Sequence, residues 1–543
     1  MHPLNWRKPT LIPLSNPLLP WMILSVIIFT NAAAVISAFS VMIADSSIQG
    51  ELVVGDYKNM WLSLAYLLIT AVTVPLSNWS ADRFGYKTIF FLGAVTFFLP
   101  TFFSGFMTNY EGMITLRSLS AVGGGMIFPT SITLIDESFS KSRRTVALAL
   151  YVAGAFGVGT VGGIFLGGAL TEFYSWHTVF FIMGIFGPIV FIASWLLIHE
   201  TQQKEMGPFD FIGTLFYLLF IWNIVVWLSN LKQPWDTEGF RAPSSELALT
   251  LGVLFFICFV WRELTTKHPL IKIHLLKSRP FVISNVAIFV IASAFFSTVS
   301  NLTMIFEDEL SYSKYQTALL QIPFGIFLGL FGALSGILSS KISVRILAVI
   351  GMALTALSCF SGHSITIQSP HWQYYSVEIM RGIGIGLSLG PLTALAMKRI
   401  RMEDVGQAAV IITLFRQLGG SMGSMITGLI ERVRYPFHLL RFGEQMKLSS
   451  PALQEYLRKK NDYLVENAGS IPDVFPVGSE GFGEAASIRS MDQLVEYASK
   501  QARILSINDA YYLIGWITLA ILCTISFFMI RAKIRERREN IVV

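Results

Sequence analysis

Charged residues are scarce in this chain. Asp, Glu, Lys and Arg make up 14% of its 543 residues, compared with about 25% in ordinary soluble domains. This composition excludes a disordered chain, a nucleic-acid-binding domain and a soluble enzyme of usual composition. The formal net charge of +6 does not alter that conclusion, because the position of the charges along the chain matters more than their sum.

Several motifs that carry chemistry are absent as well. The three cysteines, Cys258, Cys359 and Cys523, lie inside apolar runs without a Cys-x-x-Cys pair, so neither a disulfide framework nor a zinc site is indicated. The eight histidines are scattered and none belongs to a His-Glu-x-x-His motif. The chain has no Walker A sequence and no potassium-channel filter sequence. We therefore expect no enzyme activity, no metal and no cofactor.

Apolar residues, by contrast, are abundant. They make up 53% of the chain, Phe alone counts 43, and the mean hydropathy is +0.60. A spanning helix needs about 20 predominantly apolar residues. Fourteen runs meet this condition and predict an all-α polytopic membrane protein: 20–44, 58–80, 87–107, 112–135, 145–170, 176–198, 210–230, 246–264, 281–304, 316–340, 344–364, 373–397, 406–430 and 510–531.

The first run and the charges between runs predict the orientation. Arg7 and Lys8 precede that run as in a signal peptide, but its length of about 25 residues exceeds the signal core of about 7–15, so we expect a retained helix.

If both termini are cytoplasmic, the inner segments hold 23 Lys and Arg residues and the short outer loops hold four. The positive-inside rule therefore predicts cytoplasmic termini.

A weak internal repeat divides the chain. Arg117 and the glycines that follow it in the fourth run resemble Arg381 and its following glycines in the twelfth. Repeated helix pairs of this kind occur in transporters that bind substrate between two halves. The repeat predicts three parts: an N-terminal six-helix half over 1–200, two inserted helices with a cytoplasmic loop over 201–280, and a C-terminal six-helix half over 281–543.

The segment 431–509 joins the last two runs on the predicted outer face. It holds two predicted helical stretches, near 451–464 and 490–505, with a Pro/Gly-rich piece at 469–483 between them. Loops of this length are usually functional or disordered. The segment is therefore either a flexible connector or a docking surface for a partner.

A few charged residues lie inside apolar runs, where each costs about 2.5–3.5 kcal/mol at the helix centre. Arg416 lies about ten residues into the thirteenth run, roughly 15 Å deep. We expect it and the neighbouring Gln417 to face a wet cavity or a buried acceptor. Glu378 and Arg381 share one helix face, either as an ion pair that lets the helix insert or as a proton or substrate site.

Polar and small residues give three further candidates. Asn31, in the middle of the first run, is either a helix–helix hydrogen-bonding group or a substrate or proton-path contact. The loop after the second run could latch one conformation or carry only a surface ion pair. Two sets of glycines favour close helix packing, which in a rocking transporter is also a sliding contact. The loop residues are Asp82, Arg83, Gly85 and Lys87, and the glycines are Gly159, Gly163, Gly167, Gly419 and Gly420.

The loop at Asp82–Gly85, Arg117 with its glycines, and the Gly-rich fifth run resemble the signatures of the major facilitator superfamily. The segments 209–213, 261–279 and 415–421 narrow the resemblance to its fourteen-helix drug:proton antiporter family, of the EmrB type. The resemblance covers nearly the whole chain. It implies the major facilitator fold, with two six-helix halves plus two inserted helices.

The sequence departs from that family at several positions. The family has an Asp midway in helix one that is linked to proton coupling, but here that stretch, residues 30–34, reads Thr-Asn-Ala-Ala-Ala and contains no acid. The opening Gly of the loop motif is Asn78. The Gly-Pro of helix five reads Gly163-Ile164, and the Asn of helix six is Met183. If antiport persists, Glu378 is the best remaining membrane carboxylate, with Arg381 and Arg117 as further proton-coupling or ion-pair candidates.

The resemblance implies a secondary-active exporter of hydrophobic or amphipathic small molecules, of the multidrug efflux type, driven by the proton gradient. The cavity would be lined by helices one, four, five, twelve and thirteen, with Asn31, Arg416 and Gln417 as substrate candidates. It also implies a bacterial inner membrane and a periplasmic adaptor that contacts 431–509. The alternatives are a proton-independent or substrate-specific exporter of a siderophore, lipid or metabolite, and a non-transporting membrane scaffold or sensor.

Overall fold

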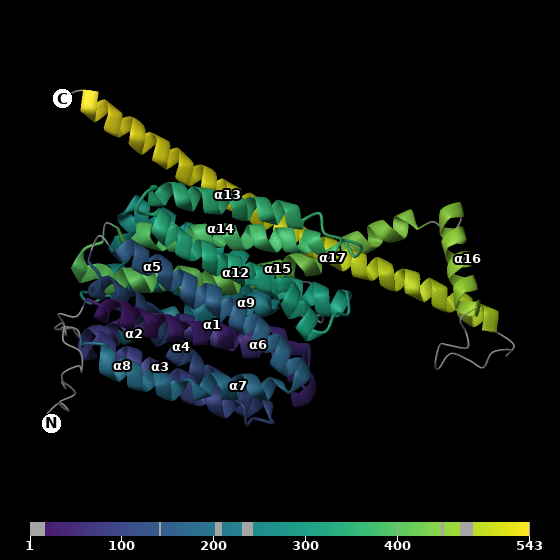
Figure 1. The fold of residues 1–543 in the computed structure, drawn as a ribbon, viewed down its shortest axis with the longest axis horizontal. Helices are drawn as coiled ribbons and strands as arrows, with labels where there is room; N and C mark the ends of the chain where they lie inside the picture. The colour runs from purple at the N-terminus through teal and green to yellow at the C-terminus, as the bar shows by residue number, and fades with distance from the viewer. Residues whose placement is uncertain are drawn as a thin grey trace.

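The structure, a computed structural model, describes residues 17–140, 143–200, 209–230, 243–398, 400–446, 450–466 and 482–541. These residues are nearly all helical and include no β-strand. They contain 14 helices long and apolar enough to cross a membrane, which run side by side along the long axis of the molecule (Figure 1). The predicted all-α polytopic fold is confirmed. Arg7 and Lys8, and most of the Pro/Gly-rich piece at 469–483, lie outside the described residues.

The first six spans form what we call the N-terminal half. The fifth span consists of α5, the π-helical turn η1 and α6, and the sixth of α7 and α8. A π-helical turn widens a helix locally and is frequent at functional sites. The elements are α1 (Leu19–Leu52), α2 (Asp56–Phe84), α3 (Tyr86–Ser104), α4 (Tyr110–Ser138), α5 (Arg144–Val152), η1 (Ala153–Val158), α6 (Gly159–Phe173), α7 (Trp176–Ile185) and α8 (Gly187–Leu197).

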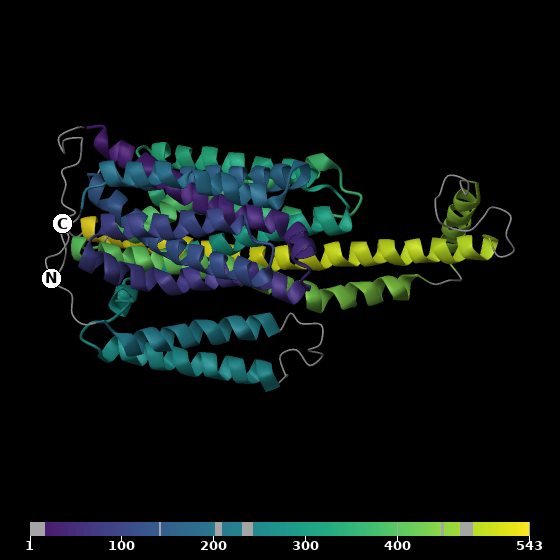
Figure 2. The ribbon, with the colours of Figure 1, turned by 90° about the horizontal axis from the view of Figure 1, so that it is seen from below.

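The next two spans, α9 (Phe211–Asn230) and α10 (Pro243–Thr265), form a pair set to one side of the bundle (Figure 2). Only 28% and 22% of their spans are buried, against 72% for the first span, so most of their surface is left for lipid. Arg262 of α10 pairs with Asp210 at 3.1 Å. The Tyr217 hydroxyl of α9 donates to the Ala71 carbonyl of α2 at 3.0 Å, which ties the pair to the N-terminal half.

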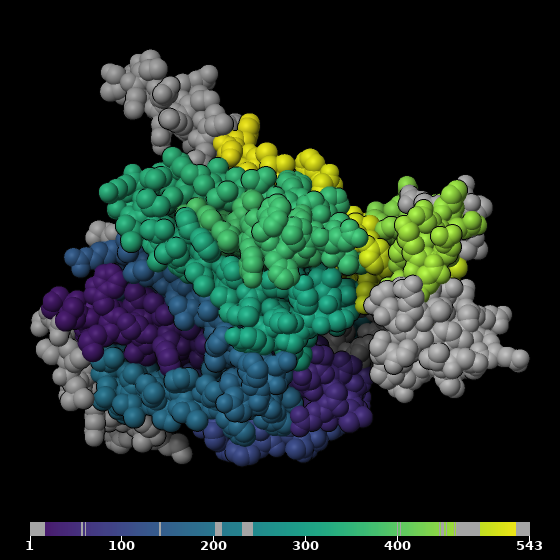
Figure 3. All heavy atoms as spheres, turned by 45° about the vertical axis from the view of Figure 1, so that its right-hand side comes forward, coloured from purple at the N-terminus to yellow at the C-terminus, as the bar shows by residue number. Residues whose placement is uncertain are grey.

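The last six spans form what we call the C-terminal half, which lies beside the N-terminal half (Figure 3). Its elements are η3 (Ile273–Lys277), α11 (Arg279–Met304), the π-helical turn η4 (Ile305–Glu309), α12 (Lys314–Leu338), α13 (Val344–Gly362), α14 (His371–Met397), η5 (Met402–Asp404), α15 (Val405–Gln445), α16 (Pro451–Glu466) and α17 (Phe482–Ile541). The residue boundaries predicted for the three parts of the chain stay predictions.

The segment 431–509 differs from the predicted loop. Both predicted helical stretches occur, but α15 continues without a break to Gln445, and α17 runs from Phe482 into the last span. These helices extend beyond the bundle together with α16 (Figure 2). Charged side chains stabilise the extension, because Asp509 of α17 pairs with Arg434 at 2.5 Å and His438 at 2.8 Å.

Glycines let the two halves approach along the fifth span and α12. A Cβ built on Gly157 would lie 2.3 Å from the Gly329 Cα, and one on Gly168 would lie 2.5 Å from the Ala318 Cβ. Real Cβ atoms essentially never come so close. The helix backbones therefore touch directly, and a larger side chain at Gly157 would push the halves apart.

We expect Gly157→Ala to lower the free energy of unfolding by about 1–3 kcal/mol, the usual cost of overpacking. Gly329→Ala is the matched control, since its Cβ would lie 3.4 Å from the Gly157 Cα, an ordinary contact. Thermal unfolding of both purified variants in the same detergent measures the difference. Equal melting temperatures for the two variants would contradict the close contact at Gly157.

Candidate functional site

Asn31 on α1 is buried in the middle of the N-terminal half and joins three helices. Its Nδ2 donates to the Ser131 hydroxyl of α4 at 2.7 Å and to the Ile27 carbonyl at 2.8 Å. The Tyr151 hydroxyl of α5 donates to its Oδ1 at 3.1 Å. Both donors and the acceptor of the amide are therefore used, which offsets the cost of burying it. This geometry is that of a helix–helix link.

Arg416 lies about 17 Å along α15 from its start at Val405, at about 1.5 Å per residue. Only 2% of the residue is exposed. Its guanidinium carbon lies 4.7 Å from the ring centroid of Phe156 on η1 and 5.4 Å from that of Phe128 on α4. Arg416 therefore projects from the C-terminal half onto the N-terminal half, with Tyr151 beside it.

The guanidinium has no carboxylate partner among the residues that the structure describes, and the polar group that interacts with it is the Tyr151 hydroxyl. The Nε, Nη1 and Nη2 atoms of Arg416 are all buried, and none has a partner in hydrogen-bonding geometry among those residues. The sequence predicted that Arg416 faces a wet cavity or a buried acceptor, and this stays a prediction; in the structure the rings of Phe156 and Phe128 and the Tyr151 hydroxyl surround it. Gln417, the next residue, is 5% exposed.

Aromatic rings extend this contact between the halves. Phe156 lies 6.2 Å from Phe295 of α11, and Phe295 lies 5.3 Å from Phe39 of α1, measured between ring centroids. The π-helical turn η1 carries Phe156, so the widened helix directs this ring towards α15 and α11. We call the following residues the central cluster: Asn31, Phe128, Ser131, Tyr151, Phe156, Phe295 and Arg416.

Arg117 is buried separately within the N-terminal half. Its Nη1 donates to the Ser37 hydroxyl of α1 at 2.9 Å, and its guanidinium carbon lies 4.4 Å from the Tyr66 ring centroid of α2. A hydroxyl acceptor and a cation–π contact offset part of its burial cost. The structure does not pair Arg117 with Glu378.

Glu378 and Arg381 form an ion pair of 2.8 Å within α14, with side chains 1% and 0% exposed. The Arg381 guanidinium carbon lies 4.9 Å from the Tyr511 ring centroid of α17, and its Nη2 lies next to Gly362 of α13. The pair thus lies among α13, α14 and α17 of the C-terminal half. The structure does not bring it into the central cluster, and its coupling role stays a prediction.

The predicted gating loop lies where the halves meet at one end of the bundle, which we call the inner end because the sequence predicts that it is cytoplasmic. The Tyr86 hydroxyl lies 3.0 Å from Asn78 Oδ1 and 3.1 Å from Asp82 Oδ1. Gly406, at the start of α15, packs onto this group, because a Cβ there would lie 2.1 Å from the Tyr86 hydroxyl. Asp82 therefore supports a contact between the halves.

The other loop residues lie around this contact. Gly85 has φ +99°, and a Cβ on it would meet the Glu200 carboxylate, so this turn requires glycine. Lys87 donates from Nζ to the Trp195 carbonyl of α8 at 2.8 Å. Arg83 stacks on the rings of Trp79 and Phe84. Lys87 thus ties α3 to α8 within the N-terminal half.

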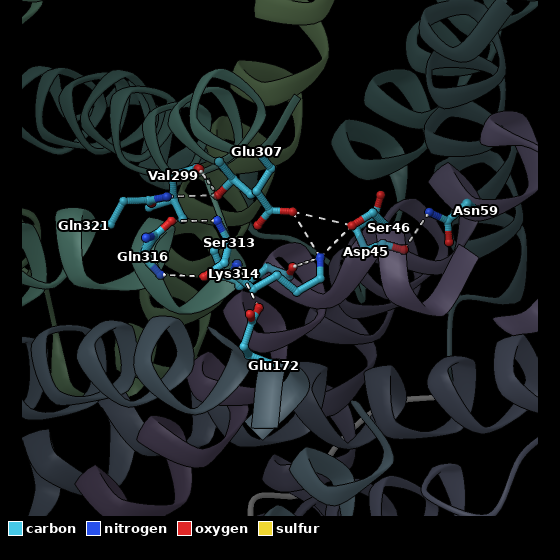
Figure 4. Close-up of polar contacts among 12 residues, drawn as sticks. Asp45, Ser46, Asn59, Glu172, Val299, Glu307, Ser313, Lys314, Gln316 and Gln321 are labelled. Carbon is cyan, nitrogen blue, oxygen red and sulfur yellow. Dashed lines mark hydrogen bonds and ion pairs between the residues drawn. The ribbon is translucent and has the colours of Figure 1, made fainter. Parts of the chain in front are cut away.

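The outer end has a polar contact between the halves, centred on Lys314 at the start of α12 (Figure 4). Its Nζ donates to the Ser46 hydroxyl of α1 at 2.5 Å and pairs with Glu307 at 3.0 Å. Its backbone N–H donates to Glu172 of α6 at 3.2 Å. Glu307 lies in the π-helical turn η4, which continues α11 and directs this carboxylate towards Lys314.

The predicted packing glycines all face another helix. Gly159, Gly163 and Gly167 of α6 pack on α1, where their Cβ atoms would come within 2.7, 2.7 and 2.8 Å of Val35, Phe39 and Ser40. Gly419 and Gly420 of α15 pack on α11, against Phe289 and Phe296. These five glycines therefore join helices inside each half, whereas Gly157 and Gly168 join the two halves.

Sequence reasoning missed several site residues. Ser131, Tyr151 and Phe156 are ordinary residues inside apolar helices, so nothing in the sequence singles them out. Lys314 could have been found, since it follows the acidic residues 307–309 across a short turn. Asp136 could also have been found, as an acid at the end of an apolar run. Its buried side chain pairs with Arg144 at 2.7 Å.

Fourteen candidate spans, with two sets of helices that meet around buried polar and aromatic side chains, define a multi-pass membrane transporter. A family model described as Major Facilitator Superfamily matches residues 21–424. The chain therefore belongs to the major facilitator superfamily.

Relatives and solved structures agree with this assignment. The chain is similar to the uncharacterized transporter YhcA of Bacillus subtilis (22% identity, covering 92% of this chain and 90% of YhcA). It is also similar to the fatty acid resistance protein FarB of Neisseria gonorrhoeae (24% identity, covering 82% of this chain and 87% of FarB). A third relative is the multidrug export protein EmrB of Escherichia coli (23% identity, covering 76% of this chain and 80% of EmrB).

Two solved structures share the fold. One is the proton:xylose symporter XylE (TM-score 0.58, 13% identity, covering 94% of this chain and 95% of XylE). The other is a bacterial homolog of the human lysosomal transporter Spinster (TM-score 0.51, 16% identity, covering 93% of this chain and 99% of that chain). Together with the fourteen spans and the relatives, they confirm the resemblance found in the sequence.

We expect Asn31→Ala to lower the free energy of unfolding by about 1–3 kcal/mol, because the substitution leaves buried polar groups of Tyr151 and Ser131 without their partner. Ser25→Ala, an exposed substitution on the same helix, should change it by less than about 0.5 kcal/mol. Thermal unfolding in detergent reports both values. If Asn31→Ala melts like Ser25→Ala, the amide is not the link described here.

Proposed function

We propose that this chain is a secondary-active exporter of hydrophobic or amphipathic small molecules, driven by the proton gradient through alternating access. The observation that carries the proposal is the central cluster, in which a cation of one half faces polar and aromatic side chains of the other. Transporters with two such halves bind substrate between them. The names of the relatives EmrB and FarB, which describe drug export and fatty acid resistance, support export over uptake.

Alternating access requires contacts between the halves that can open at either end. The inner contact at Gly406, where α15 packs on Tyr86, and the outer contact at Lys314 suit this role. Water can replace the hydrogen bonds of Lys314 when the outer contact opens, so that contact contributes little net free energy. We infer that one contact opens in each state, while the glycine contact at Gly157 acts as the pivot.

Proton coupling is proposed for Glu378, which is buried beside Arg381. A buried carboxylate can be neutral or charged depending on whether its cation stays close, so a movement of α14 against α17 could load and release a proton. A second candidate function is a proton-independent or substrate-specific exporter. The stretch 30–34 of helix one favours it, because it contains no acid where the family carries one linked to proton coupling.

A bacterial inner membrane and a periplasmic adaptor are further proposals. The extension formed by α15, α16 and α17 leaves the bundle at the outer end (Figure 2), which suits a protein-binding surface. Crosslinkers placed along this extension in native membranes test the idea. Crosslinking to a second protein supports an adaptor, and crosslinking within the chain alone counts against one.

We expect Glu378→Gln to abolish substrate-evoked proton movement in liposomes that contain a pH-sensitive dye, because the amide cannot exchange the coupled proton. Glu496→Gln is the control, since that carboxylate is 60% exposed on α17 and pairs only locally with Lys500; it should keep wild-type flux. Substrate movement without proton flux in the wild type would overturn proton antiport and favour the proton-independent exporter.

A further inference from the structure

Arg416 has a buried cationic group that the packing of the chain leaves unsatisfied. It lies at mid-helix between the two halves, and all three of its guanidinium nitrogens lack a hydrogen-bond partner among the described residues. The Tyr151 hydroxyl beside it already donates to Asn31. A buried guanidinium presents five N–H donors, so this arrangement carries a large unused capacity to bind an acceptor.

The other two buried arginines of the described residues differ from it. Arg381 has a carboxylate partner in Glu378 at 2.8 Å, and Arg117 donates to the Ser37 hydroxyl. Arg416 has no carboxylate partner, and the Tyr151 hydroxyl beside it and cation–π contacts to Phe156 and Phe128 offset only part of its burial cost. An uncompensated buried charge is expensive, so a ligand that supplies the missing acceptor is strongly favoured.

The surroundings decide which ligand chemistry fits. A cationic ligand would be repelled by the guanidinium, and an uncharged apolar ligand would leave it unpaired. A carboxylate or sulfonate can accept two parallel N–H bonds from one guanidinium. The rings of Phe128, Phe156 and Phe295 can hold an apolar body next to that head group.

We propose that Arg416 binds the head group of an amphipathic organic anion between the two halves, with the neighbouring phenylalanines against its apolar body. The proposal rests on the proposed export function and names its substrate class. Because Arg416 belongs to one half and the rings of Phe128 and Phe156 to the other, such a ligand contacts both halves at once.

The first test uses the wild-type protein in nanodiscs and three probes with the same twelve-carbon tail: dodecanoate, dodecanol and dodecyltrimethylammonium, each below its micellar concentration. We expect dodecanoate to bind at least about tenfold more tightly than the other two, since only it forms a charge-assisted pair with Arg416. Equal affinities, or tighter binding of the cation, would overturn the proposal without any substitution in the protein.

The second test compares Arg416→Gln, Arg416→Lys and the control Arg441→Gln, an exposed arginine on the same helix. Arg416→Gln should weaken dodecanoate binding at least about tenfold and leave dodecanol binding unchanged, which also shows that the variant is folded. Arg416→Lys should retain part of the affinity, and Arg441→Gln all of it. Wild-type dodecanoate affinity in Arg416→Gln would contradict the proposal.

Binding and transport separate this inference from the proposed function. Arg416-dependent dodecanoate binding without transport of any probe would support the anion site and reject the exporter. Transport of dodecanoate that is unchanged in Arg416→Gln would support the exporter and reject the anion site. Excess sodium chloride is then added to wild-type protein with bound dodecanoate. Unchanged dodecanoate binding excludes a site for small inorganic anions, whereas full displacement by chloride would overturn the amphipathic assignment.

Discussion

The cost of burying charge in an apolar bundle governs this structure. Arg381 meets that cost with Glu378, Asp136 with Arg144, and Asn31 with Ser131 and Tyr151. Each of these partnerships lies inside one half and holds its helices together. Arg416 is different, because it crosses to the other half and finds aromatic rings there. The buried Arg416 guanidinium, which has no carboxylate partner, therefore lies between the two halves, where transporters of this architecture bind their substrate.

The contacts between the halves differ in kind along the bundle. The middle is held by direct backbone contact at Gly157 and Gly329, which tolerates rotation but no added side chain. One end is held by the hydrogen bond of Lys314 with Ser46, and the other by the packing of Gly406 on Tyr86. Close backbone contact depends on packing, whereas water can replace the hydrogen bonds of Lys314. This distribution suits two rigid bodies that rock about their centre.

Much of the fold could be predicted from the sequence, because the length of apolar runs is set by bilayer thickness and all fourteen runs became spans. Helix ends were less predictable: the apolar run ends at residue 430, but α15 continues to Gln445, and ion pairs to Asp509 stabilise this extension. Asn31, Arg117, Glu378 and Arg416 stood out because polar groups are rare in such runs. Their partners did not stand out, because Ser131, Tyr151 and Phe156 lie a hundred residues or more from Asn31 or Arg416 in sequence and meet them only through packing.

The central claim is that substrate binds between the two halves at the level of Arg416. A cryo-EM map of the protein in nanodiscs with a transported substrate tests it most directly. The account predicts added density between α15 and the α4–η1 surface, within hydrogen-bond distance of the Arg416 guanidinium. Substrate density elsewhere, for example against α9 and α10, with Arg416 still facing only Phe128 and Phe156, would contradict it.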